Sequence, residues 1–118
     1  MNIESVREYC LKKKGAVESF PFDETSLVIK VMNKMFILID LEGANNIALK
    51  CNPERVVELR EQYSAIGPAA YFNKKHWNKI CLIGDVNDKL LKELIDHSYD
   101  EVIKKFTKKM RVEYDALP

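Results

Sequence analysis

The segment 73–78 holds the residue types best suited to binding a polyanion. Its order is Asn73-Lys74-Lys75-His76-Trp77-Asn78. The two lysines can contact phosphates, and the rings of His76 and Trp77 offer flat faces on which an unpaired base can stack. A single tryptophan in a small domain is more often part of the core, with the neighbouring lysines merely solvating a turn. Both interpretations are open from the residues alone.

Lys30, Lys34 and Lys50 form a second set of candidate phosphate ligands. Lys30 lies in an apolar stretch, Lys34 follows Asn33 in a predicted turn, and Lys50 ends a predicted strand. On adjacent strands the three ammonium groups could gather on the helix-free side of a sheet. Lysines that face water on strands also keep a sheet soluble and protect its edges from pairing with other strands. A purely structural role for these lysines therefore remains as an alternative to phosphate binding.

Asp96, His97 and Ser98 spell out the residue types of a catalytic triad, but their spacing argues against one. Successive residues of a helix diverge by about 100° around its axis, so these three side chains cannot hydrogen-bond in series. We expect Ser98 and Tyr99 to pack against the sheet and His97 to pair with Glu93. The sequence therefore predicts no catalytic site and a protein that is not an enzyme.

The metal-binding and cofactor-binding residue types are present without the spacing that either function needs. Cys10, Cys51 and Cys81 are widely separated and form no CxxC or His-Cys pair, so neither a metal site nor a disulfide framework is expected. The sequence has four glycines and no glycine-rich phosphate loop. We expect no cofactor and no metal.

The elements that must position these side chains follow from local patterns. Apolar residues at helical spacing after Asn2 predict a first helix that Gly15 stops. Strands are expected at 25–32, 35–41 and 47–51, with turns at Asn33-Lys34 and at 43–46. Asn52-Pro53-Glu54 starts a second helix, strands follow at 69–72 and 79–83, and Asn87 or Asp88 caps a long third helix.

The predicted fold class is therefore α+β with two layers. The order is helix, three strands, helix, two strands, helix, in one domain spanning 1–118, with an antiparallel sheet that carries its helices on one face. The basic tail (Lys104, Lys105, Lys108, Lys109 and Arg111) is either a nucleic-acid-gripping extension or a helix end that complements its dipole, and we favour the second.

Composition indicates the type of domain and its expected cellular location more clearly than it indicates the function. Of the 118 residues, 47% are hydrophobic and 31% are charged, which is ordinary for one globular domain. The formal net charge is +1, so nucleic-acid binding would require a local basic patch. The charged amino-terminal stretch has no apolar core of a signal peptide, and no apolar run is long enough to span a bilayer. We expect a cytoplasmic protein that does not bind membranes.

Five short segments together resemble the MmcQ/YjbR family almost from end to end. They are Lys30-Val31, Lys34-Met35-Phe36, 49–54, 73–78 and 95–100. The resemblance implies an α/β fold in the element order given above, similar to secretion-chaperone-like domains. It also implies DNA binding, in which two hairpins act as wings.

The resulting functional expectation is DNA binding without enzymatic activity. Lys30, Lys34, Lys50, Lys74 and Lys75 would contact phosphates while His76 and Trp77 stack on bases. The alternative is a protein-interaction module, which predicts an exposed apolar patch around Val28 and Met32. A weaker alternative is a small-ligand pocket near Tyr71, Trp77 and Tyr99. The sequence leaves the oligomeric state open.

Overall fold

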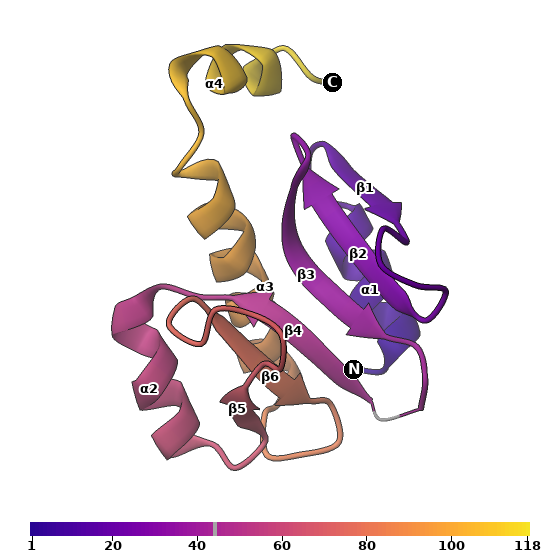
Figure 1. Cartoon of the computed structure of the whole chain (residues 1–118), viewed down its shortest axis with the longest axis vertical. Coiled ribbons are helices and arrows are strands. Elements are labelled where there is room, and N and C mark those ends of the chain that lie inside the picture. Colours follow the sequence, from indigo (N-terminus) through magenta and orange to yellow (C-terminus); the bar gives the residue numbers. More distant parts are fainter. Residues whose placement is uncertain (44) are drawn as a thin grey trace.

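The computed structural model describes residues 1–43 and 45–118. Within them the chain forms four helices and a six-stranded antiparallel sheet in the order β1-β2-β3-β4-β6-β5 (Figure 1). The helices are α1 (Ile3–Leu11), α2 (Pro53–Gln62), α3 (Asp88–Ile103) and α4 (Lys108–Asp115). The strands are β1 (Ala16–Ser19), β2 (Ser26–Val31), β3 (Lys34–Asp40), β4 (Asn46–Lys50), β5 (Ile66–Pro68) and β6 (Trp77–Cys81). The predicted α+β fold class is confirmed.

The first three helices begin where the sequence places their caps. Asn2 and Ser5 form a reciprocal capping box at α1, because each side chain accepts from the other residue's backbone N–H. Asn52 caps α2 just before Pro53, and the Asn87 side chain accepts from the backbone N–H of Leu90 at the start of α3. These caps satisfy N–H groups that have no partner inside the helix.

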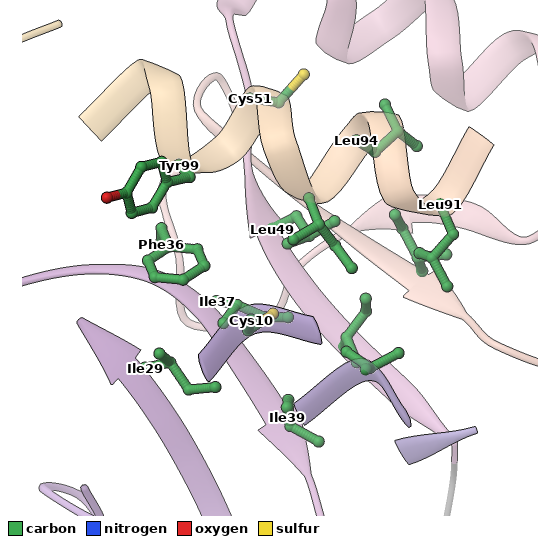
Figure 2. Close-up of a cluster of buried hydrophobic side chains, with 14 of the residues drawn as sticks. Cys10, Ile29, Phe36, Ile37, Ile39, Leu49, Cys51, Leu91, Leu94 and Tyr99 are labelled. Carbon is green, nitrogen blue, oxygen red and sulfur yellow. The ribbon is translucent and has the colours of Figure 1, made fainter. Parts of the chain in front are cut away.

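The helices α1, α2 and α3 cover one face of the sheet, and the main core lies between these helices and the strands. Leu91, Leu94 and Tyr99 of α3 lie over Phe36 and other buried residues of the strands (Figure 2). The rings of Tyr99 and Phe36 meet edge to face, with their centroids 5.4 Å apart. The side chains of α1 and α2 complete the same cluster through Val6, Cys10, Val56 and Leu59. The predicted two-layer arrangement is therefore correct.

The opposite face of the sheet is covered by a loop instead of a helix. Residues 69–76, between β5 and β6, fold back so that Ala69 and Phe72 pack with Trp77 and Ala48 in a second, smaller core. This loop lies in front of β4 and β6 in Figure 1.

Four details of the predicted elements are wrong. The β2–β3 turn is Met32-Asn33, both with positive φ as in a type I′ hairpin, so Lys34 is the first residue of β3 and pairs with Val31. Residues 69–72 are not a strand; β5 precedes them and ends at Pro68. Both β1 and α4 were missed in the sequence. The predicted turn at 43–46 includes residue 44, which lies outside the described residues.

Across the described residues, no helix has both the length and the apolar character needed to cross a membrane.

Candidate nucleic-acid interface

Lys34 and Lys50 come together at one end of the sheet, where Lys105 joins them. Lys34 begins β3 directly after the type I′ turn, Lys50 ends β4, and Lys105 follows the end of α3. All three line one surface hollow of about 210 Å³, whose apolar wall is made by Val102 and Phe106. The hollow lies beside the end of α3, and not on the helix-free side of the sheet where the lysines were expected.

The electrostatics of this hollow favour an anion. Lys50 is half-buried, and this burial, together with the positive charges of Lys105 and Lys34, lowers its pKa, while Glu101 opposes the shift. The Glu101 carboxylate is already paired with Lys104, at 2.8 Å. Of the five described residues that line the hollow, three are lysines and none is acidic. Three like charges held this close repel one another, and a bound phosphate would relieve that repulsion.

Lys74 and Lys75 are exposed in the loop 69–76, whose end is fixed next to Lys50. The backbone N–H of Cys51 donates to the carbonyl of His76 at 2.8 Å, and Lys50 lies opposite Trp77 in the pairing of β4 with β6. The loop therefore rejoins the sheet at the same strand end that carries Lys50.

Arg60 of α2 anchors this loop from the other side. Its guanidinium donates to the carbonyl of Lys74 at 2.6 Å, to the carbonyl of Trp77 at 3.1 Å and to Oδ1 of Asn78 at 2.7 Å. Asn78 is buried and in turn donates to the carbonyl of Val56. One arginine thus fixes the path of the backbone that presents Lys74 and Lys75.

Two of the predicted contacts do not belong to this surface. Trp77 is only 8% exposed, and its indole stacks on the ring of Phe72 with the centroids 4.6 Å apart. The prediction that this indole is an open face for a base is therefore wrong, because the indole packs inside the second core. Lys30 lines a separate hollow with Val17 and Met32 near β1, so it does not join Lys34 and Lys50. His76 is half-buried.

The sequence underrated Lys105. The sequence places it in a basic tail that either grips nucleic acid or, in the interpretation favoured above, complements a helix dipole. In the structure α3 ends at Ile103 and the chain then turns, with α4 starting at Lys108. The feature of the sequence that could have indicated a role for Lys105 is the density of lysines after the last apolar residue of α3. Nothing in the sequence indicates that this turn brings Lys105 to the ends of β3 and β4.

Asp96, His97 and Ser98 contact different partners and not one another, as helical geometry requires. Asp96 accepts from Lys13 and Tyr9, and Ser98 donates to the carbonyl of Phe36. The Nε2 atom of His97 accepts from the backbone N–H of Asn52, at 3.1 Å. His97 was expected to pair with Glu93, which is wrong.

The two alternative interfaces do not form from the residues that the sequence named for them. Val28 is fully buried and Met32 is half-buried, so neither is the centre of an exposed apolar patch. The exposed rings nearby are those of Phe22 and Tyr71, which line a hollow with Leu38, the cross-strand neighbour of Val28. Tyr71 and Trp77 lie on the loop-covered face of the sheet while Tyr99 lies in the main core, so these three do not line one pocket.

The six-stranded antiparallel sheet with its helices defines an α+β domain, which carries a lysine-lined hollow at one end of the sheet. The family model YjbR matches residues 11–101, and the chain belongs to this family. The Escherichia coli K12 relative, which bears the name Uncharacterized protein YjbR, is 33% identical over 87% of this chain and 88% of its own length.

Solved structures extend the likeness to nearly the whole chain. The Deinococcus radiodurans protein DR2400, whose crystal structure is described as a DUF419 domain, is 39% identical and superposes with a TM-score of 0.90 over 99% of this chain and 89% of its own. The crystal structure of a Pseudomonas syringae protein is 29% identical, with a TM-score of 0.72 over 86% of this chain and 98% of its own.

Proposed function

We propose that this protein is a non-enzymatic DNA-binding domain that contacts phosphates through Lys34, Lys50 and Lys105. Lys74 and Lys75 extend the contact along the adjacent loop. The observation that carries the proposal is a hollow lined by three lysines from separate segments, with no acidic residue among the described residues of its lining.

The remaining charge of the molecule makes this local cluster meaningful. The chain holds 19 lysines and arginines against 18 acidic residues, so its net charge gives little overall attraction for a polyanion and binding must come from a local cluster of cations. Ion pairs do occupy Arg7, Lys13, Arg55 and Lys104. Phosphate contacts of this kind carry little base information, so binding should depend weakly on sequence.

The structure alters the expected mechanism in one respect. Because Trp77 is buried, base stacking does not contribute through its indole, and affinity comes from charge. Duplex DNA, with its higher charge density, should then bind at least as tightly as a single strand of the same sequence.

The proposal is tested by measuring binding to fluorescently labelled single-stranded and duplex oligonucleotides at low salt. The test variant changes Lys34, Lys50 and Lys105 to Gln, and the matched control changes three exposed lysines elsewhere, namely Lys12, Lys79 and Lys89. Both variants lose the same net charge. The hollow variant should lose at least about tenfold in affinity, while the control should lose much less.

Two results would remove the proposal. One is an absence of binding by the unaltered protein to either oligonucleotide at low salt. The other is an equal loss in the hollow and control variants, which would mean that only the total charge matters. Changing Lys74 and Lys75 to Gln should give an intermediate loss.

A further inference from the structure

An aromatic groove crosses the face of the sheet that no helix covers. Two hollows, of about 370 and 160 Å³, share Leu38, Ala70 and Phe72 among their lining and therefore lie side by side on this face. We call the two together the aromatic groove. The residues lining its larger end are Phe22, Asp23, Ser26, Leu38, Ala70, Tyr71 and Phe72.

The rim of the aromatic groove exposes two aromatic rings to solvent. Tyr71 is fully exposed and Phe22 is 64% exposed, although large apolar side chains usually gain free energy by burial. Tyr71 also has a φ of +67°, in the left-handed region that non-glycine residues rarely adopt. A strained backbone that holds an aromatic ring out in water is a feature found at binding sites.

The floor and the acidic side of the aromatic groove are rigid. Phe72 is stacked on the buried indole of Trp77, which fixes the plane of its ring. The carboxylate of Asp23 accepts from the backbone N–H groups of Thr25 and Ser26, at 2.9 and 2.7 Å. These hydrogen bonds lower the pKa of Asp23, so the carboxylate stays charged beside the rings.

The charges along the aromatic groove favour a cation. Asp23 lines the larger end, where no lysine or arginine joins the described lining, and Asp40 lines the smaller end together with Lys79. The faces of aromatic rings carry negative potential and attract ammonium and guanidinium groups. Three rings with an ionised carboxylate beside them therefore match a cationic side chain at the larger end.

We propose that the aromatic groove binds a lysine or arginine side chain presented by a partner polypeptide. The cation lies at the larger end, among Phe22, Tyr71 and Asp23. The neighbouring backbone of the partner lies along Leu38 and Ala70 toward Asp40. A polypeptide fits better than a free amine because the smaller hollow lies beside the larger one, and a single amine would leave it empty. This inference does not depend on the proposed DNA binding, whose central lysines Lys34, Lys50 and Lys105 line a different hollow.

The test is a nuclear magnetic resonance titration of the full chain with two short peptides. One is alanine-based with a central lysine, and the other replaces that lysine with norleucine, which keeps the length and removes the charge. The lysine peptide should shift the amide signals of residues that line the groove and bind at least about threefold more tightly than the norleucine peptide. In Tyr71→Gly, which suits the left-handed backbone, its affinity should fall about three- to fivefold.

Control variants separate the rings from general effects. Tyr71→Phe should retain binding because it keeps the ring, and Ile83→Ala should retain it because Ile83 is exposed but outside the groove. The proposal is overturned by an absence of groove shifts, by equal affinity for both peptides, or by unchanged binding in Tyr71→Gly. If n-butylammonium binds as tightly as the lysine peptide, the groove is a small-amine site and the polypeptide assignment is wrong.

Discussion

Replacing Arg60 with Met should destabilise the protein far more than replacing Arg55 on the same helix. The Arg60 guanidinium donates to three acceptors, of which the Oδ1 atom of Asn78 belongs to a residue that is only 2% exposed. Hydrogen bonds that involve a charged group contribute about 1.5–3 kcal/mol each, and a buried acceptor left without a donor costs about 1–3 kcal/mol. The three bonds share one side chain and are not additive, so we expect a total loss of about 3 kcal/mol.

Arg55→Met is the matched control. Arg55 pairs with Glu93 at 2.9 Å, and both side chains are substantially exposed to solvent. Exposed pairs of this kind contribute about 0–1 kcal/mol, so this variant should be close to the unaltered protein. Methionine keeps the helical propensity and much of the aliphatic stem in both variants.

Urea unfolding followed by circular dichroism measures both losses. Hydrogen exchange adds a local readout, because the amide of His76 donates to the carbonyl of Asn73 inside the anchored loop. Arg60→Met should speed its exchange and Arg55→Met should not. The reasoning is refuted if the two variants lose the same free energy of unfolding, or if the exchange of His76 is unchanged in Arg60→Met.

Three further predictions concern pH, packing and thiol reactivity. Burial and the nearby Arg55 lower the pKa of His97, so as pH falls the unfolded chain takes up a proton at His97 before the folded protein does. The free energy of unfolding should therefore decrease as pH falls from about 6.5 toward 5. Urea titrations should show a smaller decrease in His97→Gln. Gly84→Ala should cost about 1–3 kcal/mol in the same assay, because the added Cβ would lie 2.4 Å from the Cβ of Ala65. Burial raises the pKa of Cys51 to about 11, so at pH 8 the half-exposed Cys81 should react with Ellman's reagent much faster than Cys51, as mass spectrometry of the labelled peptides would report.

Each of these predictions has a clear contrary result. A pH dependence that is unchanged in His97→Gln would mean that His97 does not control it. An unaltered unfolding midpoint in Gly84→Ala would mean that the turn moves freely away from Ala65. Rapid labelling of Cys51 in the folded protein would contradict its burial.

The parts of the fold that the sequence predicted are those set by neighbouring residues. Asn2, Asn52-Pro53 and Asn87 mark helix starts because capping involves residues two or three positions apart. The β2, β3 and β4 strands were predicted because each is rich in β-branched, aromatic or aliphatic residues. The predicted bounds of β2 and β3 were offset by one residue at their turn because Asn33 occupies the second left-handed position, and not the first as expected.

The missed strands depend on contacts between distant segments, whereas α4 begins at a local cap that was overlooked, the Thr107 side chain accepting from the backbone N–H of Met110. The three-residue β5 exists through pairing with β6, and it tolerates Pro68 because it lies at the sheet edge. The four-residue β1 likewise depends on β2. The same limit applies to the site: nothing near Trp77 in sequence shows that Phe72 covers it, and no local pattern brings Lys105 to Lys34.

The salt dependence of DNA binding tests the central claim most directly. Each phosphate contact contributes about 0.9 to the slope of log affinity against log salt for duplex DNA. The slope should therefore become shallower by about 2–3 when Lys34, Lys50 and Lys105 are all changed to Gln, and by a clearly smaller amount when Lys12, Lys79 and Lys89 are changed. Identical slopes for the hollow and control variants would contradict the assignment of this hollow as the phosphate-binding site.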